Sequence, residues 1–182
     1  MEQKLMIPNT QIRVATVIDK KFVDHLQWKF AKSISFQTHA AIDAYIDRGC
    51  VKIALENDEP CGYVLAMPYL ASNLCIRPIF QTAVCMDAQR RHHGLAIISQ
   101  HANDAVRDGQ SVLQANVRDG IDANDFFLAA GFVKIASWNP NTQRKRLINC
   151  WRKCLTEKRP MWFCSPPSRA GHTARLITNM SR

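Results

Sequence analysis

A basic turn between an apolar strand and an amphipathic helix is the segment of this sequence best suited to hold an anion. The apolar run that ends at Val84-Cys85-Met86 is followed by the polar stretch 87–93 and then by Gly94. The first turn of a helix has backbone N–H groups without a partner inside the helix, and the helix dipole is positive there. Gly94 permits close approach of a phosphate, and Arg90 and Arg91 add positive charge. A solvated turn between strand and helix has the same residue pattern, so both interpretations stay open at this point.

The overall charge also favours an anionic partner. The 182 residues include 24 Lys and Arg against 15 Asp and Glu, a formal net charge of +9. This surplus favours a phosphorylated cofactor, a nucleic acid or an acidic surface without choosing among them. The length and the 47% hydrophobic content indicate one globular domain, 1–155. A basic, Pro-containing extension, 156–182, lies outside it, and Trp162 and Phe163 are candidates to dock onto the domain.

The cysteines and the N-terminus predict a cytoplasmic protein. The seven cysteines include no CxxC pair, the start has no long apolar segment typical of a signal peptide, and no apolar run is long enough to cross a membrane. Cys150, Cys154, Cys164 and His172 have ligand chemistry suited to zinc, but their spacing fits no compact zinc finger. We therefore expect no metal and no membrane contact.

Hydrophobic periodicity predicts the elements that must position the basic turn. The predicted strands are 11–17, 51–55, 62–67, 79–86, 112–117, 132–137 and 147–155. The first predicted helix begins at Asp19, and three further helices are predicted at 39–47, 95–107 and 121–130. Strands and helices alternate with one hairpin early and one late, which predicts an α+β fold with a mixed sheet.

A second segment narrows the interpretation. Between Val117 and Val133 a strand end is followed by a short helix with Asn124, an aromatic pair and then Gly131-Phe132. Together the two segments resemble the GNAT acyltransferase superfamily, whose pattern is a strand ending in Val, then Gln/Arg-x-x-Gly-x-Gly/Ala, and later Asn-x-Phe-Tyr-x-x-x-Gly-Phe. Gln89 stands at the Gln/Arg position and Gly94 at the last glycine, while His92 replaces the first glycine. An alternative register runs from Arg91 through Gly94 to Ala96. The resemblance covers about residues 11 to 155.

The resemblance implies a mostly antiparallel sheet with helices on both faces and a splayed strand pair, and it implies that acetyl-CoA is the co-substrate. Turn amides would bind the diphosphate, and the strand edge at Val84 would pair with pantetheine, beside a gap to strand 112–117. The implied cofactor-binding residues are Val84, Cys85, Met86, Gln89, Arg90, Arg91, His92, His93, Gly94, Leu95, Ala96, Asn124 and Phe127. A backbone N–H near Met86 would stabilise the oxyanion that forms when an amine attacks the thioester.

The groups that move protons are harder to find. Many family members use a Glu as base, and this chain has no Glu between Glu59 and Glu157. Asp87, Gln81, His92, His93 and His101 are the nearby candidates, of which we favour Asp87 and His101. His92 and His93 lie in the presumed phosphate-binding turn, and an ordinary exposed position on a helix is the alternative for His101. The family's Tyr acid is Phe127 here, which has no proton to donate, and its neighbour Phe126 is expected in the core.

The acceptor side is less determined by sequence. Tyr63, Tyr69 and Gln81 are candidate substrate contacts, and sheet packing is the alternative for both tyrosines. The apolar residues between Phe22 and Phe36 suit a core, an acceptor pocket or a dimer face. The expected acceptor is a small-molecule or peptide amine, and the protein is expected to be a monomer or a homodimer. A binding module that has lost activity and an enzyme acting on a nucleic-acid amine remain as alternatives.

Overall fold

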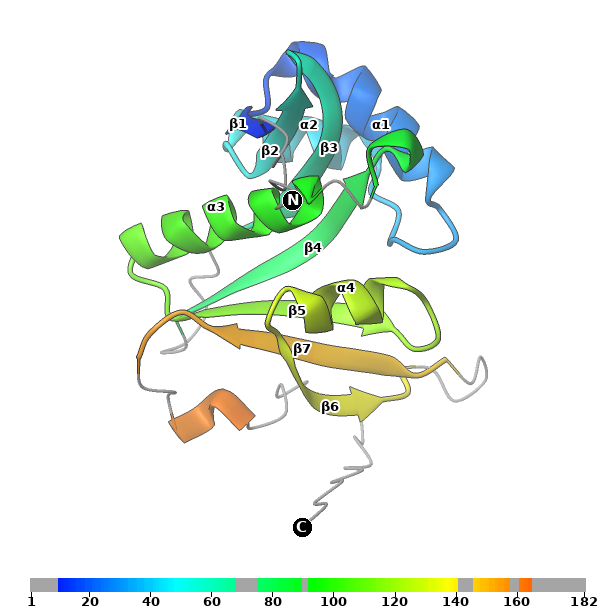
Figure 1. Ribbon diagram of the computed structural model, residues 1–182. Coiled ribbons are helices and arrows are strands. Elements are labelled where there is room, and N and C mark those ends of the chain that lie inside the picture. Colours follow the sequence, from blue (N-terminus) through cyan, green and yellow to red (C-terminus); the bar gives the residue numbers. More distant parts are fainter. Residues whose placement is uncertain (1–9, 68–74, 90–91, 141–145, 158–160, 165–182) are drawn as a thin grey trace, which may run out of the picture. The chain divides into compact units, whose positions relative to one another are not determined.

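The structure is a computed structural model that describes residues 10–67, 75–89, 92–140, 146–157 and 161–164. It has an α+β fold built on a seven-stranded, mostly antiparallel sheet, as the sequence predicts (Figure 1). The strands are β1 (Thr10–Val14), β2 (Val51–Glu56), β3 (Glu59–Ala66), β4 (Ile76–Val84), β5 (Val112–Arg118), β6 (Val133–Trp138) and β7 (Ile148–Cys154). The α-helices are α1 (Lys20–Lys29), α2 (His39–Asp47), α3 (His93–Arg107) and α4 (Ala123–Ala129). Short 3-10 helices are η1 (Val17–Asp19), η2 (Met86–Ala88) and η3 (Met161–Cys164).

The chain divides into two compact units, and the division passes through β4 and α3. The first unit comprises Met1–Met67 and Ile79–Asp104, and the second comprises Pro68–Pro78 and Ala105–Arg182. The predicted gap between the strand ending at Val84 and strand 112–117 concerns the junction of these units, so it stays a prediction. The same holds for the predicted domain boundary after residue 155.

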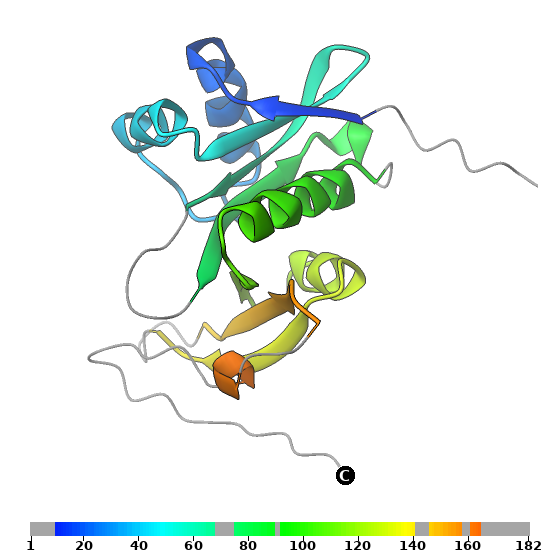
Figure 2. The ribbon, with the colours of Figure 1, turned by 90° about the vertical axis from the view of Figure 1, so that its left-hand side faces the viewer.

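In the first unit the strand order is β1-β2-β3-β4, and each neighbouring pair is antiparallel. The helices α1 and α2 cover one face of these strands, and α3 covers the other (Figure 2). Alternate residues of β2 and β3, among them Ile53 and Leu65, pack against Val23, Leu26 and Ile42 of α1 and α2. This layering brings the C-terminal end of β4 and the N-terminal end of α3 into one unit.

Gly62 marks the closest approach between β3, β4 and α3. A Cβ atom at this position would lie 2.9 Å from the backbone oxygen of Ala83 and 3.4 Å from the Cδ1 atom of Ile97. We predict that Gly62→Ala lowers the free energy of unfolding by about 1–3 kcal/mol, because a backbone oxygen cannot rotate away as a side chain can. Urea unfolding measures the change. A variant as stable as the wild type would contradict this packing.

In the second unit the strand order is β5-β7-β6, again with antiparallel pairs. Phe163 of η3 is 2% exposed and packs with Ile76 and Val112. Its carbonyl oxygen accepts a hydrogen bond from Nη1 of the buried Arg152 (2.6 Å), whose Nε donates to Oε1 of Gln114 (2.8 Å). Phe163 therefore packs in the core of the second unit, as anticipated.

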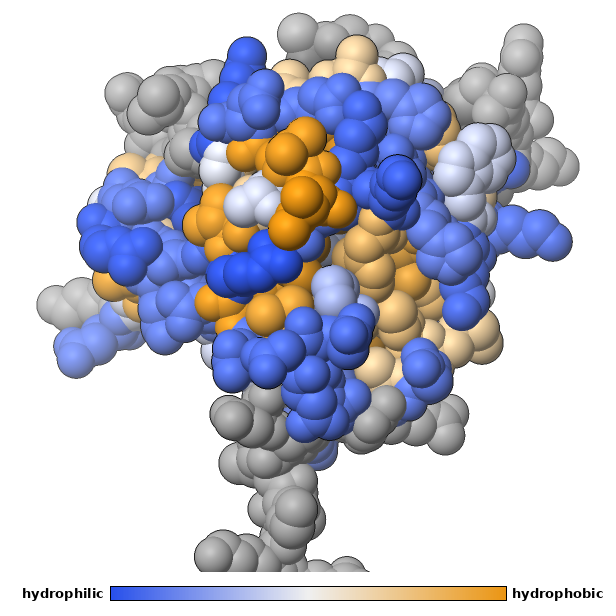
Figure 3. Space-filling model, turned by 90° about the horizontal axis from the view of Figure 1, so that it is seen from above, coloured by the Kyte–Doolittle hydropathy of each residue, from blue (hydrophilic) through white to orange (hydrophobic). Residues whose placement is uncertain are grey.

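The surface of the described residues is mainly hydrophilic, with apolar areas between the charged side chains on the face seen in Figure 3. Among these residues no helix combines the length and the apolar character needed to span a membrane.

Candidate functional site

The candidate site is built where β4 ends and α3 begins, in the first unit. After Val84 the chain makes the short helix η2, and α3 starts at His93. Among the described residues, the helical bonds of α3 begin with the one from the Ala96 N–H to the carbonyl oxygen of His92 (2.9 Å). The backbone N–H groups of His93, Gly94 and Leu95 precede this bond, so they lie in the first turn, where no helical acceptor exists. Arg90 and Arg91, the predicted cationic contacts, lie outside the described residues.

The backbone at the end of β4 has one edge directed away from β3. The Cys85 N–H donates to the carbonyl oxygen of Cys61 on β3 (2.8 Å). Because the backbone groups of successive strand residues alternate in direction, those of Val84 point to the opposite edge. The Val84 carbonyl oxygen accepts a hydrogen bond from Nε2 of Gln89 (3.2 Å). A ligand amide that pairs with Val84 would replace this side chain.

The residues beyond Val84 are accessible. Met86 is 63% exposed, and Asp87 is exposed beside it on η2. Cys85 is half-buried, and burial, followed by the Asp87 carboxylate, raises the pKa of its thiol, while Lys29 lowers it. A neutral thiol is a poor nucleophile, so Cys85 is not suited to act as one.

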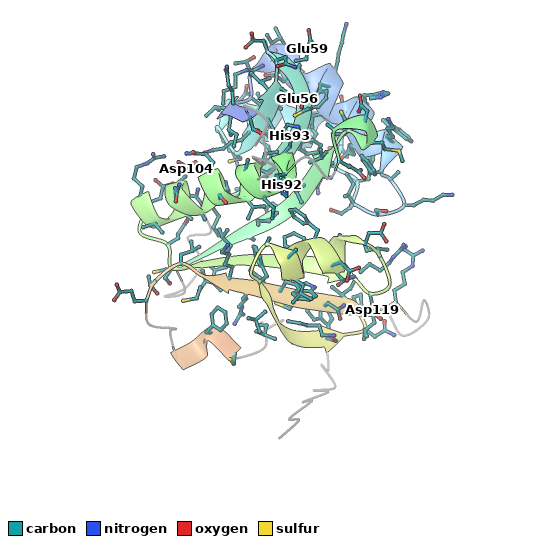
Figure 4. The ribbon with its side chains drawn as sticks, viewed as in Figure 1. Glu56, Glu59, His92, His93, Asp104 and Asp119 are labelled. Carbon is teal, nitrogen blue, oxygen red and sulfur yellow. The ribbon has the colours of Figure 1, made fainter. Side chains whose placement is uncertain are left out.

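The two histidines at the start of α3 have different surroundings (Figure 4). His92 is exposed and has a φ of 66°, in the left-handed region. His93 is buried, with Nδ1 2.9 Å from Oγ1 of Thr10 and Nε2 3.3 Å from Oε1 of Glu56. The His93 side chain thus points into the protein toward β1 and β2, and the predicted contact of His93 with the cofactor stays a prediction for its backbone. His93 can contribute only its backbone N–H to an anion.

His101 is buried as well, with 3% of its surface exposed, so the expectation of an ordinary exposed position is wrong. Farther along the same helix, Asp104 forms a salt bridge with Lys52 of β2. The buried face of α3 is thus partly polar. His101 lies in the middle of α3, and its role as a base stays a prediction.

On the opposite face of the strands, Tyr63 and Gln81 belong to a buried hydrogen-bond network. The Tyr63 hydroxyl donates to Oε1 of Gln81 (3.0 Å), and Nε2 of Gln81 donates to Oε1 of Gln27 (2.8 Å) and to the carbonyl oxygen of Ser35. The Gln27 side chain also exchanges hydrogen bonds with the backbone of Gln37 (2.7 and 2.9 Å). Tyr63 and Gln81 are therefore not surface contacts for a substrate; they tie the α1–α2 connection to the sheet. Tyr69 lies outside the described residues.

This network predicts a change in stability at alkaline pH. Burial, followed by the Asp24 carboxylate, raises the pKa of the Tyr63 hydroxyl above its usual value of 10.0. Above pH ~10 the unfolded chain loses a proton that the folded chain keeps, so the free energy of unfolding falls by up to about 1.4 kcal/mol per pH unit. We expect Tyr63→Phe to remove this contribution, as measured by urea unfolding at pH 9 and pH 11. Identical pH profiles for both proteins would contradict the assignment.

In the second unit, Asn124 holds the turn between β5 and α4. Its Nδ2 donates to the carbonyl oxygens of Arg118 (2.8 Å) and Ile121 (2.9 Å), and its Oδ1 accepts from Asn149 (2.9 Å) and Trp151 (3.0 Å). These four bonds use the full capacity of the side-chain amide. A contact between CoA and this side chain would break one of them, so the geometry favours a positioning role.

Phe127 is buried between Phe126 and Phe132, with ring centroids 5.3 and 5.0 Å away. Phe126, which the sequence analysis placed in the core, is only half-buried. The rotation of α4 about its axis therefore buries Phe127 and leaves Phe126 half-buried. Phe127 fills the core of the second unit, and its predicted contact with the cofactor gains no support.

Sequence reasoning missed Gln27 and Glu56. Gln27 lies four residues after Val23 on the buried face of α1, and a polar residue at an apolar position of a helix is the signal that could have revealed it. Glu56 ends β2 and gave no such signal. Within the described residues no group of three or more His, Cys, Asp and Glu side chains is arranged to hold a metal ion.

Comparisons with known proteins bear on the fold. No protein-family model matches the chain, and no curated protein matches its sequence. Many solved structures do match. One is Ard1 from Thermoplasma volcanium, 18% identical with a TM-score of 0.69, covering 81% of this chain and 99% of that one. Another is an acetyltransferase of the GNAT family from Bacillus cereus, 13% identical with a TM-score of 0.65, covering 80% of this chain and 96% of that one.

A third similar structure was solved with a ligand. N-acetylglutamate synthase from Neisseria gonorrhoeae, complexed with coenzyme A and N-acetyl-glutamate, is 17% identical with a TM-score of 0.67. The match covers 81% of this chain but 35% of that longer one. The order of elements and these likenesses agree, and the chain has the fold of the GNAT acetyltransferases.

Proposed function

We propose that this protein transfers an acetyl group from acetyl-CoA to a primary amine. The observation that supports the proposal most is the path of the chain after β4, where a half-buried strand end leads through the exposed Met86 and Asp87 into a helix whose first-turn amides precede the Ala96–His92 bond. Backbone amides at a helix N-terminus favour an anion such as a diphosphate. The backbone of Val84, directed away from β3, is suited to pair with the amides of pantetheine.

In the proposed reaction the neutral amine nitrogen attacks the thioester carbonyl carbon. The C–S bond then breaks, an amide forms, and the CoA thiolate takes up the proton that the nitrogen loses, directly or through water. The backbone N–H of Met86 is the proposed hydrogen-bond donor to the oxyanion that develops on the thioester carbonyl. Holding the amine and the thioester side by side would supply much of the rate enhancement.

Asp87 is the candidate base that the geometry favours over His101. It is exposed on η2, next to Met86, whereas His101 is buried within α3. Arg90 and Arg91 remain proposed contacts of the diphosphate, and the backbone of His93, Gly94 and Leu95 supplies the amides, while the Ala96 N–H is engaged within the helix. The acceptor arrives as an ammonium ion, and water would carry its extra proton to Asp87 before the neutral amine attacks.

A second candidate function is binding of CoA without transfer. The observation that favours it is Phe127, which stands where the family has a Tyr and is a core residue with no hydroxyl. The acidity of the CoA thiol reduces the need for such an acid, so the first proposal remains preferred.

Release of free thiol from acetyl-CoA, with and without a panel of small amines and peptides, tests the proposal. We expect thiol release that depends on an amine, together with mass-spectrometric detection of the acetylated amine. A rise in the melting temperature with CoA but no acetylated product would favour binding alone. No rise and no product would exclude both candidates.

A further inference from the structure

Two aromatic side chains are exposed together beside the first unit's sheet. Trp28, at the end of α1, is 63% exposed, and Phe36, in the connection to α2, is 47% exposed. Their rings meet edge to face with centroids 5.2 Å apart. Val23 and Leu26 show that the buried face of α1 is elsewhere on the helix. The pair is therefore a surface feature and does not belong to the core.

A hydrogen bond and a longer-range charge effect place this aromatic pair near the end of β4. The carbonyl oxygen of Ser35, the neighbour of Phe36, accepts a hydrogen bond from Gln81 of β4. Lys29, the neighbour of Trp28, acts electrostatically on the Cys85 thiol. The pair thus flanks the last residues of β4 on the face covered by α1, while the diphosphate-binding turn belongs to α3 on the other face.

The buried network holds this position firmly. Gln27 and Gln81 join α1, the connection 30–38 and β4 through hydrogen bonds that are shielded from water. A rigid aromatic surface loses little conformational entropy when a ligand binds, and flat apolar groups stack on it. The surface formed by Trp28 and Phe36 is therefore preorganised for binding.

We propose that Trp28 and Phe36 bind the body of the acceptor, which makes the preferred substrates primary amines with an aromatic or other flat apolar group. This inference rests on the proposed acetyl transfer. The amine would reach past the pair toward the thioester at Cys85 and Met86. The ammonium group of Lys29 disfavours a second positive charge nearby, so it favours the neutral amine that attacks the thioester.

Binding and transfer are measured separately to test this proposal. Isothermal titration with 2-phenylethylamine and with propylamine, in the presence and absence of CoA, compares an aromatic amine with an aliphatic one. We expect the aromatic amine to bind at least about tenfold more tightly, and Trp28→Ala or Phe36→Ala to abolish this preference. Trp28→Phe should retain it, because the aromatic surface remains. Leu128→Ala, which removes an exposed apolar side chain in the second unit, is the matched control and should change nothing.

Equal affinities for the two amines, or a preference that survives Trp28→Ala, would overturn the proposal. So would a dimer in sedimentation velocity that Trp28→Ala dissociates, since the pair would then be an interface between copies. Binding with the expected preference but without acetylated product would refute the transfer reaction and leave this binding surface in place. Transfer without the preference would refute the binding surface alone.

Discussion

Gly94→Glu should weaken acetyl-CoA binding by about 100-fold, equivalent to about 2.7 kcal/mol, without lowering the melting temperature. A carboxylate in the first turn of α3 would stand where the diphosphate must approach, and would repel it. The same negative charge is favourable for a helix N-terminus, so the fold should be stable or slightly more stable. Isothermal titration with acetyl-CoA, paired with a thermal melt, measures both effects.

The matched control is Asn103→Glu, which adds the same charge at an exposed position about 13 Å farther along α3. It should bind acetyl-CoA within about twofold of the wild type, because charges separated by more than about 8–10 Å are largely screened at physiological salt. Equal losses in both variants would mean that net charge, and not the first turn of α3, governs binding.

Phe163→Ala should lower the free energy of unfolding by about 3–5 kcal/mol, the range for removing a buried Phe from a core. Phe163 is 2% exposed, and it packs with Ile76, Val112, Ile135 and Cys154. The cavity would also loosen η3, whose carbonyl oxygen at residue 163 holds the buried Arg152. Urea unfolding measures the loss, with hydrogen exchange of β5 and β7 amides to locate it in the second unit.

Cys164→Ala is the control for this prediction, because Cys164 is the exposed neighbour in the same short helix. It should change stability by less than about 0.5 kcal/mol. If Phe163→Ala were as stable as this control, the segment 161–164 would not be part of the core.

Most elements could be predicted because their hydrophobic periodicity is strong. The helix 39–47 and the strand that begins at Val51 start where the sequence places them. The predicted ends of several strands differ from the structure by up to three residues. One example is β4, which begins at Ile76, before Pro78, and not at Ile79 as predicted. The pairing of β4 with β3 extends only to Ile79, opposite Ala66. Pro78 therefore lies beyond this pairing, and its missing N–H costs no hydrogen bond to β3.

The side-chain environments of the candidate site could not be predicted in the same way. The burial of His93 depends on Thr10 and Glu56, which approach it from strands far away in the sequence. The pairing of Tyr63 with Gln81 depends on the register of β3 and β4, which no local pattern specifies. Which of Phe126 and Phe127 is buried depends on the rotation of a seven-residue helix, too short for a clear period.

The most direct test of the central claim is to locate where CoA touches the protein. Amide chemical shifts are recorded by NMR during titration with CoA and, separately, with pantetheine, which lacks the diphosphate. If the account is correct, CoA shifts the His93–Ala96 amides most, and pantetheine leaves them nearly unchanged while shifting those near Val84. The proposed binding of the diphosphate at the start of α3 would be contradicted if CoA left these amides unshifted, or if both ligands shifted them equally.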